Sequence, residues 1–395
     1  MPLAPFDPAV EAKEYDAIVR RVRAEWTDRH VLVAGLMAIQ QSINGWLDGD
    51  VEAKSLGVAG ACEVVLDAMA ANMENEEVQF YGCQAFRFLA TASRNIFRFE
   101  AKKGLDQLNH TLVYYVTTPR VVEQVLWTLA TFLDASEPST RRFLVDMDGI
   151  FTVLKTVQRY PQMKEIQLHG CRCLAAMTTR FQKILRMDQV EATGVHLLGL
   201  MVQSTAEPAL LISCLRGLTS ITTSDDSAAL FFADASWFRS LFLMHIKDES
   251  ILAEVLFLYI SLCHVSPHHA IELSVQGGLA CLRDALSLYL DRGEESTVYQ
   301  LVRLLHHILT LHAAPSAATL VAPLVLACQA TYDAHWKIQI ELCCILRLAL
   351  PHLPPSLLRD QKARLRRLQT LHPTQSTLVR ECNYTLQALL DTNYT

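Results

Sequence analysis

Glycine and proline are scarce in this chain, and their scarcity narrows the fold class. The 395 residues include only 15 glycines and 14 prolines, too few for the many turns of an all-β protein. Hydrophobic residues make up 51% of the chain and charged residues 19%, a balance that excludes a disordered polypeptide. The composition therefore favours long helices around a continuous apolar core.

Export and membrane signals are also missing. The first fifteen residues carry prolines and acidic residues but no apolar segment of a signal peptide. The two most apolar runs, Ile251–Val265 and Thr319–Thr331, are interrupted by Glu254 and Pro323, so neither reaches the length of a membrane span. The formal net charge of −6 disfavours nucleic acid and anionic membranes as general partners. We therefore expect a soluble, cytoplasmic protein without a membrane partner.

Motifs of known enzyme classes do not occur. The chain has no Gly-x-Gly-x-x-Gly, no P-loop, no His-Glu-x-x-His and no Gly-x-Ser-x-Gly, the patterns that bind nucleotides, bind catalytic zinc or form a nucleophile elbow. The sequence therefore predicts no enzymatic activity and no cofactor.

Cysteine and histidine pairs are the remaining candidates for metal or redox chemistry. The eleven cysteines include no Cys-x-x-Cys, and we expect free, buried thiols. Neighbouring positions on a helix point about 100° apart, which makes Cys171 with Cys173, and Cys343 with Cys344, poor chelating pairs. The same objection applies to His268-His269 and His306-His307, beside which we identify no cysteine or carboxylate at ligand spacing. The sequence therefore predicts no metal site.

Internal repeats organise most of the chain. The segment Glu77-Val-Gln-Phe-Tyr-Gly-Cys resembles Glu165-Ile-Gln-Leu-His-Gly-Cys, and a third copy begins Lys337-Ile-Gln-Ile-Glu-Leu-Cys. With Gly82 as an anchor, equivalent positions recur every 40 to 47 residues. Apolar residues at helical spacing around each anchor predict a buried helix, and small anchor residues would let a neighbouring helix approach closely. The nine anchors are Gly35, Gly82, Val125, Gly170, Cys214, Val255, Leu301, Leu342 and Cys382.

Two further helices are expected in each repeat. Glycines are predicted to open a second apolar helix at Gly60, Gly104, Gly149, Gly194 and Gly277, with one missing member near Ala235-Ser236. Short helices are predicted before these glycines, at Asn95–Ala101, Arg142–Asp148 and Ile184–Val190. A unit of 40 to 47 residues with one short and two longer helices is the armadillo pattern.

The segment Glu123-Gln-Val-Leu-Trp-Thr-Leu-Ala, followed by Arg141–Ile150, resembles an armadillo repeat of the importin-alpha and beta-catenin kind. The resemblance covers residues 30–391, approximately, and implies an all-α, right-handed superhelical solenoid of about nine repeats. HEAT repeats, which usually lack the short first helix, are the alternative. We expect residues 1–28 to cap the N-terminal end, residues 29–395 to form the solenoid, and the last repeat to end at Asp391.

The resemblance also implies where a partner would bind. In such proteins the last helix of each repeat lines a groove, where tryptophan and asparagine four residues apart clamp an extended peptide. Here only Trp127 matches the tryptophan position, and Thr131 replaces its asparagine. The missing clamp disfavours a nuclear-import receptor. The other tryptophan positions hold Met37, Gln84, Arg172, Arg216, Phe257, Arg303, Cys344 and Tyr384.

Two basic surfaces are candidate binding sites. Arg172, Arg216 and Arg303, with Trp127 and Phe257, would suit an acidic or phosphorylated extended segment. A solvated face of mixed charge is the alternative, because glutamates such as Glu123 and Glu254 lie on the same helices. A C-terminal helix would suit an acidic surface such as a tubulin tail, or RNA phosphates, unless it is simply a solvated face. Its basic residues are Arg359, Lys362, Arg364, Arg366 and Arg367.

The most favoured function is a non-enzymatic protein-interaction scaffold or adaptor. By analogy it would be a structural subunit of a larger cytoplasmic assembly, such as a cytoskeletal or axonemal (ciliary) one. The alternative is a nucleic-acid-associated subunit that binds RNA or DNA through the C-terminal basic helix.

Overall fold

The computed structural model describes residues 15–24, 28–44, 49–203, 206–222, 227, 231–232, 236–275, 277–311, 315–353 and 360–391. These residues form helices and turns, with no strand among them, which confirms the predicted all-α class. The chain divides into two compact units, Met1–Gly217 and Leu218–Thr395. The predicted boundary between a cap and an array at residue 28 stays a prediction.

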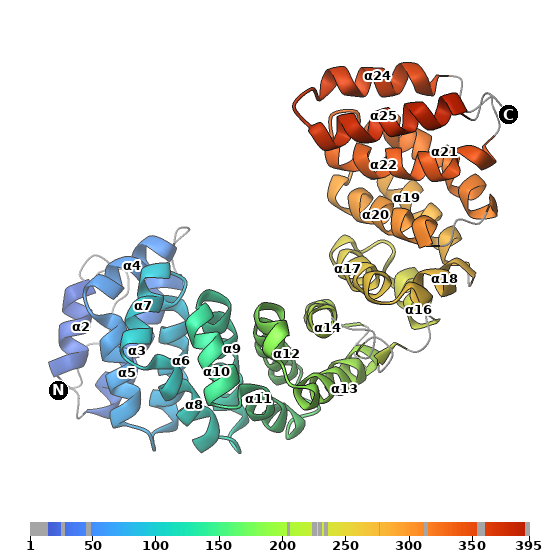
Figure 1. Ribbon diagram of the computed structural model, residues 1–395. Coiled ribbons are helices and arrows are strands. Elements are labelled where there is room, and N and C mark those ends of the chain that lie inside the picture. Colours follow the sequence, from blue (N-terminus) through green and yellow to red (C-terminus); the bar gives the residue numbers. More distant parts are fainter. Residues whose placement is uncertain are drawn as a thin grey trace. The chain divides into compact units, whose positions relative to one another are not determined.

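The first unit is a succession of short and long helices (Figure 1). They are α2 (Tyr15–Ala24), α3 (Arg29–Asn44), α4 (Gly49–Val58), α5 (Ala61–Ala71), α6 (Glu76–Leu89), α7 (Ser93–Ala101), α8 (Gly104–Tyr114), α9 (Pro119–Ala135), α10 (Glu137–Asp146), α11 (Gly149–Gln158), α12 (Lys164–Phe181), the 3-10 helix η1 (Gln182–Ile184), α13 (Met187–Gln203) and α14 (Pro208–Ile221), in which the unit boundary falls.

The second unit continues the same alternation. Its helices are α16 (Ser236–His245), α17 (Glu249–Val265), α18 (Pro267–Val275), α19 (Gly278–Arg292), α20 (Glu295–Leu311), α21 (Pro315–Thr331), α22 (Trp336–Ala349), the 3-10 helix η2 (Leu350–His352), α24 (Gln361–Leu371) and α25 (Ser376–Asp391). As predicted, a helix begins at Ser236 and the last one ends at Asp391.

All nine predicted anchors lie in the last helix of a repeat, which we call the third helix. The third helices pack on one another, α3 on α6, α6 on α9 and α9 on α12 in the first unit, and α17 on α20, α20 on α22 and α22 on α25 in the second. Their buried sides are apolar, as with Val125 and Leu129 of α9. Each repeat thus buries its apolar side on its neighbours, as a solenoid does.

The anchor glycines are sites of close helix crossing, as the sequence predicted. A Cβ atom added to Gly170 would lie 2.2 Å from Cγ1 of Val157, and one added to Gly82 would lie 2.5 Å from Cγ of Met69. In both repeats the third helix therefore crosses the second helix at a distance that only glycine allows. Gly35 has the same relationship with Val22 of α2, so α2 occupies the place of a second helix in the first repeat.

The glutamine shared by the three copies found in the sequence joins two helices of its repeat. Gln167 Nε2 donates hydrogen bonds to the carbonyl oxygens of Val157 and Tyr160, at 2.8 and 2.9 Å. Val157 lies in the last turn of α11 and Tyr160 just beyond it, and each carbonyl oxygen also accepts a backbone N–H, from Tyr160 and Met163 respectively. Gln79 does the same at the end of α5, and Gln339 at the end of α21.

One predicted break in the helices is wrong. The sequence predicted a short helix over Ile184–Val190 and a new helix at Gly194, but α13 runs unbroken from Met187 to Gln203. Before α5, α8, α11 and α19 a residue in the left-handed region separates the two helices, for example Gly60 at φ 93° or Asp148 at φ 48°. No such residue precedes Gly194 within α13, so the helix continues through it. The other short helices, α7 and α10, form as predicted.

No single helix among the described residues is long and apolar enough to cross a membrane. The bent pair of Glu249–Val265 and Pro267–Ser274, which meet at 120°, meets the length and composition of a span together.

Candidate protein-binding surface

The outward side of the third helices, which we call the third-helix face, carries the positions that the sequence singled out. In the first unit Gln84, Trp127 and Arg172 are half-buried there, and Arg216 is exposed. The positions four residues later are partly exposed at Phe88 and Thr131 and buried at Ala176 and Ser220. The face therefore offers side chains from successive repeats along one surface.

Trp127 stacks with two further side chains from the neighbouring repeats. The Cζ atom of Arg87 on α6 lies 3.3 Å from the ring centre of Trp127 on α9. The imidazole of His169 on α12 stacks on the same indole, with ring centres 4.7 Å apart and planes 14° apart. A guanidinium over an indole is a favourable cation–π contact. The two contacts restrict the side chain of Trp127 to one orientation, in which it is half-buried.

Burial makes the two ends of the stack electrostatically unusual. Burial, together with the positive charge of Arg172, lowers the pKa of Arg87 to about 10, and the charges of Cys83 and Glu123 oppose this shift. Burial, with the charges of Arg172 and Arg87, lowers the pKa of His169 to about 3. His169 is therefore neutral at pH 7, and the charge of the stack resides on Arg87.

Arginines gather around one carboxylate beyond the stack. Arg172 Nη2 lies 3.8 Å from Oδ2 of Asp134, and Arg180 donates hydrogen bonds to the carbonyl oxygens of Leu133 and Asp134. Burial raises the pKa of Asp134, while the positive charges of Arg172, Arg180 and Arg216 lower it. Three guanidinium charges therefore act on one carboxylate, with which Arg172 forms an ion pair.

Acidic residues lie at the other end of the same helices. Glu123 is one turn before Trp127 on α9, and Glu165 is one turn before His169 on α12. Burial raises the pKa of Glu123, as does the charge of Glu165. Glutamates therefore lie near the starts of α9 and α12, whereas Arg172 lies in the middle of α12 and Arg180 near its end.

In the second unit the third-helix face is rich in histidine. Phe257 on α17 is 40% exposed, and Arg303 on α20 lies close enough to His264 and His307 to lower the pKa of both, together with burial. The rings of His264 and His307 are 4.0 Å apart. Trp127, Arg172 and Arg216 belong to the first unit, and Phe257 and Arg303 to the second.

The C-terminal basic helix is partly neutralised by its own fold. Arg364 and Arg367 on α24 both contact Asp333, at 3.0 and 3.3 Å. Lys362 is half-buried and Arg366 is exposed. Arg359 lies outside the described residues. A second basic run in the sequence, from Arg94 through Arg98 to Lys102 and Lys103, is paired in the same way, since Arg98 contacts Glu63 and Lys102 contacts Asp67.

The cysteines form part of the core, as predicted. All eleven are free and buried, and Cys171 Sγ lies 3.9 Å from Cys214 Sγ on the next third helix. Burial raises the pKa of Cys62 and Cys344 to about 12, so these thiols stay protonated at pH 7.

The histidine pairs have carboxylate neighbours that the sequence reasoning passed over. His306 Nδ1 contacts Oε2 of Glu341 at 2.5 Å. His268 and His269 both lie within 4.0 Å of Glu272. The prediction that no carboxylate lies at ligand spacing is wrong for His268-His269. Glu272 follows these residues by four and three positions, and residues at those spacings share a helix face.

Four further residues of the candidate surface were missed, namely Arg87, His169, Asp134 and Arg180. Helical spacing offered a signal for two of them. Arg87 lies three residues after Gln84, and His169 three residues before Arg172, so each shares a face with a position already considered. Asp134 and Arg180 lie near the ends of α9 and α12 and have no counterpart in the repeat pattern.

A comparison with known protein families agrees with the repeat geometry described above. The family described as LRRK2 ARM repeat matches residues 28–228, just over half of the chain. The chain belongs to this family. Its repeats are thus armadillo repeats, the fold that the third helices and their anchors had indicated, and armadillo repeats form protein-interaction scaffolds.

Solved structures extend the fold likeness over the whole chain. One, solved for a phosphorylation switch that controls the interaction between cadherin and beta-catenin, has a TM-score of 0.67 and 14% identity and covers 96% of this chain and 77% of that one. An engineered protein has a TM-score of 0.51 and 16% identity and covers 64% of this chain and 98% of its own. No curated protein sequence matches the chain.

Proposed function

We propose that this protein is a non-catalytic scaffold that binds an extended acidic or phosphorylated segment of a partner protein. The binding surface is the third-helix face of the first unit. The observation behind the proposal is the group of Arg172, Arg180 and Arg216 around a single carboxylate, Asp134, beside the fixed indole of Trp127.

The chemistry of this surface suits such a ligand. Guanidinium groups bind carboxylates and phosphates through paired hydrogen bonds, and the charges of three of them already act on the carboxylate of Asp134. Trp127 adds an apolar contact whose position is already fixed by Arg87 and His169, so little side-chain entropy is lost on binding. The glutamates at the starts of α9 and α12 would repel an acidic segment from the rest of the face.

We propose in second place that the protein belongs to a cytoskeletal or axonemal assembly. A cytoskeletal or axonemal partner with an acidic tail, such as tubulin, has the required chemistry. Cytoplasmic location is part of the same proposal.

The nucleic-acid alternative has weaker support. It depends on the charges of α24, where Asp333 holds Arg364 and Arg367. Two charges engaged within the fold are less available to phosphates, so we rank this function second.

A direct test is fluorescence anisotropy with the full chain and labelled acidic peptides, in phosphorylated and unphosphorylated forms. We expect Arg172→Gln/Arg216→Gln to weaken binding about tenfold or more, since each hydrogen bond to a charged group contributes about 1.5–3 kcal/mol. The matched control is Arg141→Gln/Arg159→Gln, which removes two exposed arginines outside the third helices. Equal binding by all three proteins would refute the proposal, and loss only with Arg366→Gln/Arg367→Gln would favour the C-terminal helix.

A further inference from the structure

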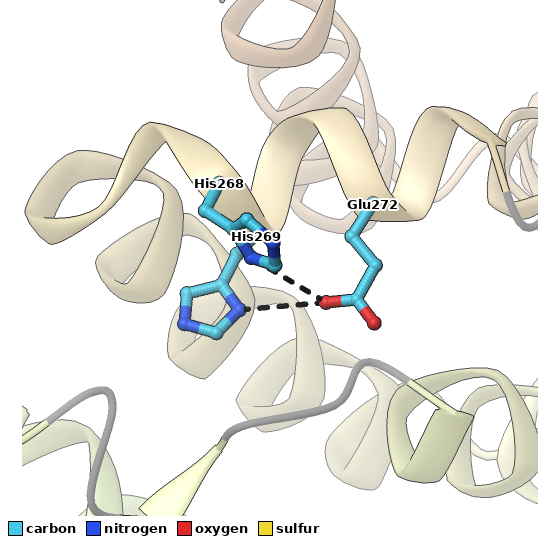
Figure 2. A group of neighbouring side chains, drawn as sticks. All are labelled: His268, His269 and Glu272. Atoms are coloured by element: carbon cyan, nitrogen blue, oxygen red, sulfur yellow. Dashed lines mark ion pairs between the residues drawn. The ribbon is translucent and has the colours of Figure 1, made fainter.

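Helix α18 brings three metal-ligating side chains together in the second unit (Figure 2). Oε2 of Glu272 lies 3.8 Å from Nδ1 of His268 and 4.0 Å from Nδ1 of His269. One ligand atom from each residue lies within 4.8 Å of the other two. Among the described residues this is the one group of three histidine, cysteine or acidic side chains that meets this spacing.

The helix explains why the three side chains converge. Glu272 follows His268 by four residues and His269 by three, so one oxygen of its carboxylate faces both imidazoles. Neighbouring histidines diverge at their Cα atoms, but both rings turn toward this carboxylate in Figure 2. The two histidines leave the helix in different directions and would be a poor pair alone, but Glu272 faces both of their rings.

The spacing is slightly wider than that of an occupied site. Bonds of about 2.0–2.2 Å from a zinc ion to nitrogen and oxygen place ligand atoms about 3.4 Å apart in a tetrahedron. The observed ion-pair distances of 3.8 and 4.0 Å need only small side-chain rotations to reach that value.

Two of the three ligands are held in place by the fold. The side chains of His269 and Glu272 are 5% and 16% exposed, whereas that of His268 is 72% exposed. The hydroxyl of Tyr259 on α17 donates a 2.9 Å hydrogen bond to the carbonyl oxygen of His269, which fixes the start of α18 against α17. Because His268 is exposed while His269 and Glu272 are largely buried, an ion would enter from solvent past His268.

We infer that His268, His269 and Glu272 form a binding site for a divalent transition-metal ion of the zinc class. Two imidazoles and one carboxylate are ligands that zinc and its neighbours prefer, whereas calcium and magnesium prefer oxygen alone. Three protein ligands leave a fourth position open for water or for a side chain of a partner. Because all three ligands come from one helix, the ion would not join separate helices.

The thiols of the chain are poor competitors for the ion. Cys263 on α17 is buried, and burial raises its pKa to about 12, so it offers a protonated thiol at pH 7. Thiolate binding would in any case be visible with Co²⁺, because cobalt–thiolate bonds give a charge-transfer absorption that nitrogen and oxygen ligands do not.

The test uses the full chain without a histidine tag, stripped of metal with a chelator and titrated with Zn²⁺ by calorimetry and with Co²⁺ by visible absorption. We expect one high-affinity ion per chain without thiolate charge transfer. His269→Ala and Glu272→Gln should each weaken binding at least about tenfold, since even outer partners of metal ligands contribute that much. His268→Ala, at an exposed position, should weaken binding without changing the melting of the metal-free protein.

The matched control is His335→Ala. His335 contacts Glu295 at 2.8 Å in the same unit, but this pair has no third ligand within the described residues, so its loss should leave the affinity unchanged. The inference is overturned if the His268→Ala protein binds Zn²⁺ as tightly as the wild type, if His335→Ala weakens binding equally, or if Co²⁺ reports thiolate ligands.

Discussion

The guanidinium of Arg87 lies 3.3 Å from the ring centre of Trp127, and these two residues belong to consecutive third helices. Because His169 covers the same indole from the helix on the other side, one side chain connects three repeats. The connection lies on the face that we propose for partner binding, so the same residues contribute to stability and to recognition.

Removal of the indole should therefore reduce stability measurably. Replacing a buried tryptophan with alanine costs about 3–5 kcal/mol, and because Trp127 is half-buried we expect Trp127→Ala to lower the free energy of unfolding by about 2 kcal/mol. Urea unfolding followed by circular dichroism measures this. Trp336→Ala, at a half-buried tryptophan of the second unit, is the control for loss of an indole. An unchanged midpoint for Trp127→Ala would show that the stack contributes nothing.

The neutral state of His169 predicts a specific dependence of stability on pH. Its pKa falls from 6.5 in the unfolded chain to about 3 in the fold, so below pH 6.5 the unfolded state binds the proton more readily. The contribution of His169 to stability is complete above pH 6.5 and falls as the pH drops toward 3, by up to about 1.4 kcal/mol for each pH unit.

The comparison that isolates this effect is wild type against His169→Phe, which keeps an aromatic ring beside Trp127 but has no titrating group. We expect the unfolding free energy of the wild type to fall more steeply between about pH 6.5 and 5 than that of the variant. Other groups, such as His307, titrate equally in both proteins. Parallel curves would mean that a protonated His169 is accommodated, for instance by Glu165, whose carboxylate lies 3.8 Å away.

Replacing one of the buried glutamines should lower the free energy of unfolding. In Gln167→Leu the carbonyls of Val157 and Tyr160 each lose their side-chain donor and keep a backbone donor, and a typical intramolecular hydrogen bond contributes about 0.5–1.5 kcal/mol. The substitution also removes Oε1 of Gln167, which is buried without a hydrogen bond, so we expect a net loss of about 1–2 kcal/mol. Thermal unfolding measures it. Gln158→Leu, at an exposed position on the preceding helix, should change stability by less than about 0.5 kcal/mol.

Two glycines in neighbouring helices predict opposite effects of the same substitution. In Gly170→Ala the new methyl group meets Val157 at 2.2 Å, and such overpacking costs about 1–3 kcal/mol. Gly199 lies within α13 with no atom within 4 Å of the added Cβ, so Gly199→Ala should stabilise the helix by about 0.5–1 kcal/mol. Melting temperatures that shift in the same direction for both variants would contradict the crossing of α12 and α11 at Gly170.

The repeat architecture was readable from the sequence because solenoid packing recurs. Close crossing demands a small residue at the same place in each repeat, which made Gly82 and Gly170 visible as anchors, and the buried sides repeat at helical spacing. The boundary at Gly194 was misjudged for the same reason. A glycine in register was taken to open a helix, whereas the break depends on a left-handed residue such as Asp148.

The binding surface was only partly readable, because its contacts do not repeat. Trp127 was found as a match to a known clamp, and Arg172 and Arg216 as departures from it. Arg87 and His169 lie 40 and 42 residues from Trp127, and Asp134 lies 38 residues from Arg172, and nothing in one repeat specifies which residues the next repeat places beside it. Asp333, which binds Arg364 and Arg367, was not predicted either, because the repeat pattern does not specify its contacts.

The measurement that tests the account most directly is affinity purification of the native protein with mass spectrometry. Wild type is compared with Trp127→Ala/Arg172→Glu/Arg216→Glu and with the control Arg141→Glu/Arg159→Glu, after circular dichroism has shown that all three are folded. We predict that a defined set of proteins with acidic or phosphorylated segments co-purifies with the wild type and the control and is lost with the triple variant. Retention of the same set by the triple variant would place recognition elsewhere on the chain and contradict the proposed role of the third-helix face.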